Sequence, residues 1–423
     1  MKIKVRDLPL DQVQSIPPEP HLRPRVPRMF FRTLVKLASQ PDLRAVHFSF
    51  TSHGMERLGK HEPALILMNH SSFIDLKIAY EILYPRPFNI VCTSDGFVGK
   101  RWLMRQLGCI PTRKFMSDIT LVRDMMYTVR KLRCSILMYP EASYSFDGTA
   151  TPLPDSLGQC LKLLRVPVIM IRTFGAFARD PLYNNLQLRD TTVTARVEYL
   201  LSPDDIAEKT VDELNGILRE QFTFDNFRWQ QEAGVAIREP FRADGLNRVL
   251  YKCPVCGREG CMQGHGTTLS CSSCGREWEL TEYGKLRCLN GESPFDHVPD
   301  WYAWERECVR RELLDGSYSL DVPVNICIMV DTRCIYRVGS GRLTHSTGGF
   351  HLSGCDGKLD VSLAPADSYS LYSDYFWYEL GDMICIGDSR ALYYCFPTDG
   401  RDVVAKTRLA TEELYKIKKK RDN

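Results

Sequence analysis

The stretch LILMNHSSFID at residues 65–75 is the most informative part of the sequence. An apolar strand ends at Asn69 and a helix begins within a few residues, so His70 and Asp75 lie at a strand-to-helix junction, the usual place for ligand chemistry in an α/β sheet. A carboxylate bonded to one imidazole nitrogen raises the basicity of the other, which can then take a proton from an attacking hydroxyl. The alternative is that Asp75 caps the helix and His70 is a satisfied loop histidine.

The sequence around this stretch alternates between short apolar strands and helical segments. This alternation predicts an α/β domain with a mostly parallel, layered sheet. A basic N-terminal arm, a helix at 28–37 and a strand-like segment at 43–52 come before the alternating strands and helices. We place the domain at residues 1–245, with irregular structure over 1–27. The expected strands are 64–68, 88–92, 135–139, 166–171 and 192–199, and the expected helices are 73–83, 99–107, 118–132, 155–164 and a helical stretch at 203–233.

Composition narrows the class of protein. The chain has 423 residues, with 55 Lys and Arg against 52 Asp and Glu, a net charge of +3. Without a global basic field, we expect no nucleic-acid partner. We find no secretory signal and no stretch of roughly 18 apolar residues that would span a bilayer. We therefore expect a cytoplasmic protein whose 16 cysteines are reduced thiols or metal ligands.

Three further blocks follow the first one in order. They are GCIPTR at 108–113, YPEASYS at 139–145 and VPVI at 166–169. Together the four blocks resemble those of the glycerolipid acyltransferase family, which includes lysophosphatidate (1-acyl-glycerol-3-phosphate) acyltransferases. That family shows an Asn-His-x4-Asp block, a Gly-x-Ile-x-x-x-Arg-like block, a Phe-Pro-Glu-Gly-Thr-Arg-Ser block and a Val-Pro-Val-Ile-Pro block. The match covers roughly residues 55–200, and four ordered blocks are more specific than one.

The resemblance implies a reaction and a set of site residues. His70 would activate the acceptor hydroxyl, supported by Asp75, for direct attack on the thioester of acyl-CoA or acyl-carrier protein. Arg113 and Glu141 would contact the acceptor head group, since a guanidinium suits bidentate phosphate binding. The remaining expected substrate-site residues are Asn69, Gly108 and Ser143, with Val166 and Pro167 lining the pocket.

The third block departs from the family pattern in three places. Ala142 replaces Gly, Ser143 replaces Thr and Tyr144 replaces Arg, which removes one cation from the expected phosphate site. We expect an O-acyltransferase of phospholipid metabolism that acts on a lysophospholipid or glycerol phosphate hydroxyl. The alternatives are an N-acyltransferase with an amine or amino-acid acceptor and a non-catalytic lipid-binding scaffold.

Access to a lipid acceptor is expected from the membrane surface. We expect a peripheral association with the inner face of the membrane. The segment 28–37 is the candidate contact, because Arg28, Arg32 and Lys36 repeat every four residues beside apolar positions. The alternative is a helix packed on the domain with a solvated charged edge.

Two CxxCG knuckles, at Cys253 and Cys256 and at Cys271 and Cys274, are separated by 14 residues. Four thiolates close a tetrahedral site, so the spacing predicts a zinc ribbon at 251–280 with one structural Zn²⁺ per chain. A pair of redox-active CxxC motifs is the alternative. Cys261 lies in the loop and is not an expected ligand.

The last third of the chain is rich in strand-forming residues. A connecting helix is expected at 297–314, followed by a β-rich module at 315–423 that ends in a helix at 406–420. About seven strands and then one helix is the element order of a pleckstrin-homology-like domain. The alternative is a small β-sandwich used for dimer contact.

Overall fold

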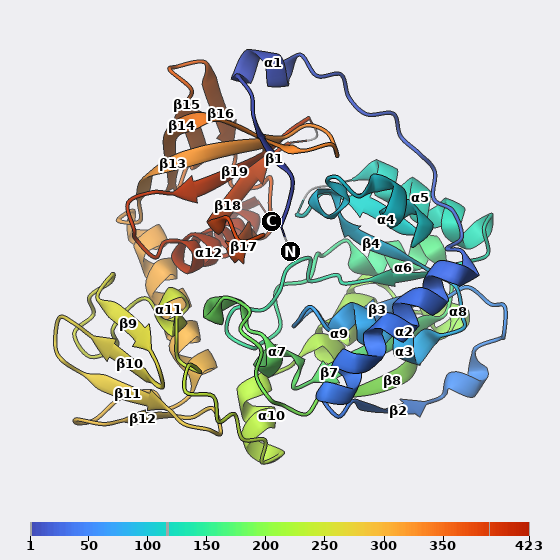
Figure 1. The fold of residues 1–423 in the computed structure, drawn as a ribbon, viewed down its shortest axis with the longest axis horizontal. Coiled ribbons are helices and arrows are strands. Elements are labelled where there is room, and N and C mark those ends of the chain that lie inside the picture. The colour runs from blue at the N-terminus through green and yellow to red at the C-terminus, as the bar shows by residue number, and fades with distance from the viewer. Residues whose placement is uncertain (1, 116–117, 389, 423) are drawn as a thin grey trace. The chain divides into compact units, whose positions relative to one another are not determined.

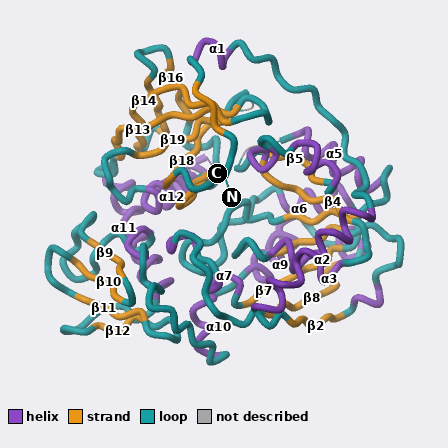
Figure 2. The backbone as a smooth tube through the Cα atoms, in the orientation of Figure 1, coloured by secondary structure: helices purple, strands orange, loops and turns teal. Residues whose placement is uncertain are grey.

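The computed structural model describes residues 2–115, 118–388 and 390–422, and Figures 1 and 2 show the course of the chain. The chain divides into two compact units. The first, the acyl unit, comprises His21–Pro181 and Gln187–Ile237, and the second, the ribbon unit, comprises Met1–Pro20, Leu182–Leu186 and Arg238–Asn423. Each unit is described by itself.

A seven-stranded sheet forms the centre of the acyl unit, in the order β2-β8-β7-β3-β6-β4-β5. All neighbouring strands are parallel except β7 and β8, which are antiparallel. The mixed α/β architecture predicted from the sequence is therefore confirmed. The strands are β2 (Ser49–His53), β3 (Leu65–Met68), β4 (Phe88–Thr93), β5 (Cys109–Thr112), β6 (Ser135–Met138), β7 (Val168–Phe174) and β8 (Thr194–Leu201).

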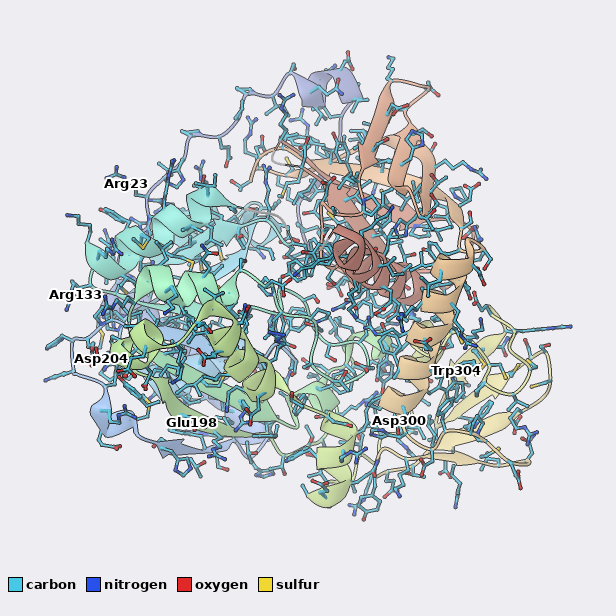
Figure 3. All side chains as sticks on the ribbon, turned by 180° about the vertical axis from the view of Figure 1, so that it is seen from behind. Arg23, Arg133, Glu198, Asp204, Asp300 and Trp304 are labelled. Atoms are coloured by element: carbon cyan, nitrogen blue, oxygen red, sulfur yellow. The ribbon has the colours of Figure 1, made fainter. Side chains whose placement is uncertain are left out.

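Helices cover both faces of this sheet. The alternation of β3 side chains divides the core in two, because Ile66 and Met68 join one apolar cluster while Leu65 and Leu67 join the other. The helices are α2 (Met29–Ala45), α3 (Asp75–Leu83), α4 (Arg101–Gln106), α5 (Ile119–Arg130), α6 (Leu157–Leu164), α7 (Ala176–Arg179), α8 (Pro203–Glu208), α9 (Val211–Phe222) and α10 (Asn226–Glu232). Glu198 of β8 and Asp204 of α8 are labelled in Figure 3.

Helix α2 corrects one expectation and bears on another. The helix runs to Ala45, so the strand-like segment predicted at 43–52 begins only at Ser49. The predicted membrane contact of segment 28–37 stays a prediction, but two of its three cations have partners within the unit. Arg32 donates to the Pro85 carbonyl and Lys36 lies 3.8 Å from Glu81 and over the Tyr84 ring, so these two cations pack on α3 and on the residues that follow it.

The opposite face of α2 is apolar and exposed. Phe30, Leu34 and Leu37 are 69%, 50% and 62% exposed. A spacing of four and then three residues places them on one side of the helix. Helix α4 extends this surface, because Trp102, which is 66% exposed, lies 5.8 Å from the Phe31 ring. We call Phe30, Leu34, Leu37 and Trp102 the apolar face.

The ribbon unit contains an eight-stranded sheet in which seven strands follow the order β16-β15-β14-β13-β19-β18-β17. The eighth, β1 (Val5–Asp7), pairs with β14 in parallel. The expectation of irregular structure over 1–27 is therefore wrong for β1 and for α1 (Leu10–Gln14). The other strands are β13 (Leu320–Met329), β14 (Ile335–Ser346), β15 (Gly349–Gly354), β16 (Leu359–Leu363), β17 (Tyr372–Trp377), β18 (Gly381–Gly387) and β19 (Leu392–Pro397).

Helix α12 (Val404–Asp422) follows this sheet, and strongly polar side chains lie buried on it. Glu412 is 1% exposed and accepts from Arg306 at 2.6 Å, from Ser370 at 2.7 Å and from Arg408 at 3.3 Å. Buried charges persist only when they are paired in this way. Seven strands followed by a helix match the expected element order, while a pleckstrin-homology-like identity stays a prediction.

The remaining part of the ribbon unit is a four-stranded antiparallel sheet beside a long helix, α11 (Val298–Asp315). The rings of Trp278 and Trp301, both fully buried, meet edge to face at 4.9 Å and join the sheet to α11. Asp300 and Trp304 of the same helix are labelled in Figure 3. The strands are β9 (Met262–His265), β10 (Thr268–Cys271), β11 (Glu277–Leu280) and β12 (Leu286–Cys288), the last of which lies beyond the predicted 251–280.

No helix among the residues described is both long and apolar enough to cross a bilayer.

Candidate functional site

Three of the four sequence blocks meet at one edge of the parallel sheet. Residues 69–75 follow the carboxyl end of β3, Arg113 follows β5, and residues 139–145 follow β6. The carboxyl ends of parallel strands form the crevice in which α/β sheets bind their ligands. The topology therefore brings together residues that are distant in the chain, such as His70 and Glu141, which lie 71 residues apart.

His70 and Asp75 contact each other at this edge. The Nδ1 atom of His70 lies 3.1 Å from Oδ2 of Asp75. The same Oδ2 accepts the backbone N–H groups of Ser71 at 2.8 Å and Ser72 at 3.1 Å, and the Asp75 side chain is fully buried. Because a carboxylate only accepts, His70 carries its proton on Nδ1 and leaves the lone pair of Nε2 for chemistry.

Two tyrosine rings enclose the imidazole of His70. The ring of Tyr139 stacks at 4.3 Å on one side and that of Tyr144 lies at 4.0 Å on the other, with Phe73 stacked on Tyr144 at 5.0 Å. The His70 side chain nevertheless remains 19% exposed. Burial lowers the pKa of His70 below its ordinary value of 6.5, the hydrogen bond and charge of Asp75 raise it, and the charge of Lys114 lowers it. A histidine with a lowered pKa is unprotonated, and so able to act as a base, at neutral pH.

Glu141 and Asn69 hold the backbone around His70. Glu141 accepts the N–H of His70 through Oε2 and that of Thr151 through Oε1, both at 2.8 Å, and it is 3% exposed. Burial raises the pKa of Glu141 to about 7 despite these donors. Asn69 accepts the N–H of Thr173 at 2.8 Å and donates to its carbonyl at 3.1 Å, which ties β3 to β7. A contact of either residue with a substrate stays a prediction.

The other expected site residues occupy loops at the same sheet. Gly108 has a φ of +78°, and a Cβ there would lie 3.0 Å from Pro27, so both its conformation and its surroundings require glycine. Arg113 is half-buried, directly after β5, and Ser143 is buried in the loop after β6. Contacts of Arg113 and Ser143 with an acceptor stay predictions. Gly108 directly precedes Cys109, the first residue of β5, so strand direction places it at the opposite edge of the sheet from Arg113 and His70, and its expected place at the substrate site is wrong.

Ala142 shows why the third block of the family contains glycine. Its φ is +56°, in the left-handed region that costs an ordinary residue roughly 1–2 kcal/mol. The loop therefore keeps the glycine conformation although the glycine is absent.

The structure corrects the expectation that Val166 and Pro167 line the pocket. They precede β7, whose first residue, Val168, pairs with Leu65, the first residue of β3. His70 lies beyond the last pair of these parallel strands, Met68 with Ile171. Since parallel strands run in one direction, Val166 and Pro167 lie at the opposite edge of the sheet and do not line a pocket at His70.

Sequence reasoning missed the aromatic enclosure and the backbone partners Thr151 and Thr173. Tyr139 and Tyr144 flank Glu141 in the third block, so their position offered a signal for the rings. Thr151 and Thr173 lie outside all four blocks, and no pattern in the chain marks them.

The electrostatics of His70 yield a prediction. Asp75→Asn removes a charge that favours the imidazolium, so we expect the pKa of His70 to fall further below its wild-type value. Lys114→Gln is the control of opposite sign, because it removes a charge that lowers the pKa. The measurement is an NMR titration of the His70 ring in each variant. An unchanged or higher pKa in Asp75→Asn would contradict the assigned electrostatics.

A second cluster of side chains lies in the ribbon unit. The four Sγ atoms of Cys253, Cys256, Cys271 and Cys274 all lie within 4.8 Å of one another. Two pairs, Cys253 with Cys274 and Cys256 with Cys271, are 3.7 Å apart. A tetrahedral site with Zn–S bonds of about 2.3 Å has S···S edges of about 3.8 Å, so the donors fit one metal ion. A fifth thiol, Cys261, lies 3.4 Å from Cys271.

Comparisons with known proteins bear on the acyl unit. A family model described as Acyltransferase matches residues 49–172. Among solved structures, the chain is similar to the 1-acyl-sn-glycerophosphate (LPA) acyltransferase PlsC from Thermotoga maritima, with 13% identity and a TM-score of 0.37 over 45% of this chain and 78% of that one. A search of curated proteins found no match. Residues 49–172, which hold the His70 site and all four blocks, thus match an acyltransferase domain.

Proposed function

We propose that the protein is an O-acyltransferase that moves a fatty acyl group from acyl-CoA or acyl-carrier protein to a hydroxyl of a lysophospholipid or glycerol phosphate derivative. The observation that carries the proposal is His70, with Nδ1 on the buried Asp75 carboxylate at 3.1 Å and its ring still 19% exposed. A histidine held in this way is a general base.

The site residues can perform the transfer without a covalent enzyme intermediate. Nε2 of His70 takes the proton of the acceptor hydroxyl as its oxygen bonds to the thioester carbonyl carbon. Asp75 stabilises the imidazolium that forms. The C–S bond then breaks, and the imidazolium returns its proton to the leaving thiolate. An ester and a free thiol result, so atoms and charge balance.

Two features of the site bear on the class of acceptor. Lys114 is close enough to His70 to lower its pKa, and Arg113 precedes it, which supports an anionic acceptor. Tyr144, however, packs its ring against His70 where the family block has arginine. The absence of that cation favours the second candidate, an amine acceptor that yields an amide.

A panel of acceptors with labelled acyl-CoA tests the reaction. We expect an ester product from a lysophospholipid or glycerol phosphate. In His70→Ala, kcat is expected to fall by at least about 100-fold, the scale of a lost general base, with the fold intact by circular dichroism. Asp75→Asn is expected to lower kcat less, since the base itself remains.

The panel also separates the alternatives. An amide product would replace the O-acyltransferase with an N-acyltransferase. Near-full transfer by a folded His70→Ala variant would refute the base. Acceptor binding without turnover, in the wild type and with either donor, would favour the lipid-binding scaffold.

We further propose that the apolar face binds the membrane surface that supplies the acceptor. Four large apolar side chains, each half exposed or more, form it on α2 and α4. Contiguous exposed apolar surface of this kind marks an interaction site. Trp102 adds an aromatic ring of the kind enriched at membrane interfaces. Arg28, exposed at the start of α2, supplies a cation for anionic lipid.

Vesicle flotation tests the apolar face. Deleting residues 1–40 is unsuitable, because β1 belongs to the sheet of the ribbon unit. We instead expect the double substitution Phe30→Glu and Leu37→Glu to abolish flotation with vesicles of phosphatidylcholine and phosphatidylglycerol. Leu188→Glu is the matched control, since Leu188 is 62% exposed on the same unit outside the apolar face. Equal flotation of the double variant and the control would refute the assignment.

We propose that the four-cysteine cluster binds one structural Zn²⁺ through Cys253, Cys256, Cys271 and Cys274. Four cysteines leave no open position, so the ion would stabilise the fold and supply no catalysis. The acyl-transfer residues all lie before residue 170.

Substituting cysteines tests the metal. We expect Cys253→Ser with Cys256→Ser to abolish zinc, measured by elemental analysis, and to change the fluorescence of the Trp278 and Trp301 pair. Cys261→Ser is the matched control and should keep one zinc per chain. Zinc-free wild-type protein, purified with reductant and without chelator, would refute the ribbon. Complete loss of turnover in a well-folded double variant would show a role for the metal in the reaction.

A further inference from the structure

A further buried carboxylate, Asp180, lies beside the turn between β3 and α3. It is 4% exposed and immediately follows α7. Its Oδ2 accepts from the Arg179 guanidinium at 2.7 Å, and its Oδ1 accepts the Ser72 hydroxyl. Arg179, itself 7% exposed, also lies 3.5 Å from Asp42 of α2. The carboxylate is thus held from α7 and is not free to move.

Ser72 connects Asp180 to the turn between β3 and α3. Its hydroxyl, besides donating to Asp180, accepts the N–H of Ile74 at 3.2 Å, and the residue is 2% exposed. Its own backbone N–H donates to Oδ2 of Asp75 at 3.1 Å, beside the bond from His70. One buried serine therefore joins Asp180 to the carboxylate that orients His70.

We propose that Asp180 and Ser72 are positioning residues, which fix the turn at 71–74 so that Asp75 meets Nδ1 of His70. The inference rests on the proposed role of His70 as the base. Neither residue is expected to touch the substrate: Ser72 points its hydroxyl at Asp180, and both are almost fully buried.

The geometry separates a positioning role from a binding role. A loosened turn changes the angle and distance between Asp75 and His70, and a misplacement of about 1 Å costs up to about 100-fold in rate. It leaves the acceptor and donor contacts unchanged. We therefore expect kcat to fall by about 10- to 100-fold in Ser72→Ala, while KM changes less than about twofold.

The test uses the full chain and two measurements. The first is kcat and KM for Ser72→Ala, Ser72→Thr and Asp180→Asn. The second is the downfield NMR resonance of the His70 Nδ1 proton in its bond to Asp75, assigned by its absence in His70→Gln. We expect Ser72→Ala to move or broaden this resonance and Ser72→Thr, which restores a hydroxyl, to recover both the resonance and the rate.

The matched control is Ser39→Ala. Ser39 is also 2% exposed, and its substitution removes a buried hydroxyl that donates to the Val35 carbonyl within α2, so it reports the effect of removing a buried serine hydroxyl away from the turn. It should leave both the resonance and kcat unchanged. Asp180→Asn keeps the shape of the side chain but loses the ion pair with Arg179. If Ser72→Ala does not fold, the kcat, the KM and the His70 resonance of Asp180→Asn test the proposal in its place.

The outcomes are distinguishable from those of the proposed function. An active wild type whose rate and His70 resonance are unmoved in Ser72→Ala and Asp180→Asn would overturn this inference alone. An inactive wild type whose resonance shifts in Ser72→Ala would support the positioning role while contradicting the acyl-transfer role of His70. A rise in KM with unchanged kcat would also overturn it, because that result marks a binding residue.

Discussion

The hydrogen bond between Nδ1 of His70 and the fully buried carboxylate of Asp75 is the interaction on which the acyl unit depends. A buried carboxylate is tolerated only when donors satisfy it. Three donors converge on one of its oxygens, two of them backbone N–H groups of the turn between β3 and α3. The conformation of the turn, the start of α3 and the orientation of the imidazole consequently depend on the same group of hydrogen bonds. A change at any member alters the others.

Buried polar side chains extend this arrangement into the sheet. Glu141 holds the backbone N–H of His70, Asn69 ties β3 to β7, and Asp180 holds Ser72. Each of these hydrogen bonds restricts the conformation of the loops at the carboxyl edge of the sheet. The rings of Tyr139 and Tyr144 complete the restraint by covering both faces of the imidazole. Contacts within the protein therefore hold the side chains of the candidate site in one arrangement.

The ribbon unit depends on polar groups in a comparable way. Lys406 of α12 bonds Glu259 of the cysteine segment and Glu312 of α11, and Lys252 meets the same two carboxylates. Together with the Trp278 and Trp301 contact, these pairs join the ribbon, α11 and α12 into one body. The cysteine segment is thus a packed part of its unit.

The limits of sequence reasoning can be seen at particular residues. The strand-to-helix junction at 65–75 could be predicted from the sequence because an apolar run ends at polar residues, and such a pattern depends only on residues that are close together in the chain. The sequence did not predict which face of α2 packs on the unit. Arg28, Arg32 and Lys36 repeat every four residues, as cations on a solvent-exposed face would. Arg32 and Lys36 nevertheless pack on α3 and the residues that follow it, because their long side chains reach backbone and carboxylate acceptors there. Likewise Val166 and Pro167 belong to one of the four blocks but lie at the edge of the sheet opposite His70, since strand direction is a property of the sheet and not of the segment.

The sequence by itself determined the alternation of strands and helices, the His70 and Asp75 pair, the order of the four blocks and the four-cysteine spacing, because each is a pattern of residue types and spacings along the chain. Only the tertiary structure decided which face of α2 is exposed, which partners satisfy Glu141 and Asn69, and that Asp180, 108 residues from Ser72, reaches the same turn. The physical reason is that burial and hydrogen-bond satisfaction depend on all elements that meet at a point. A partner brought in from a distant strand or helix leaves no local pattern in the chain.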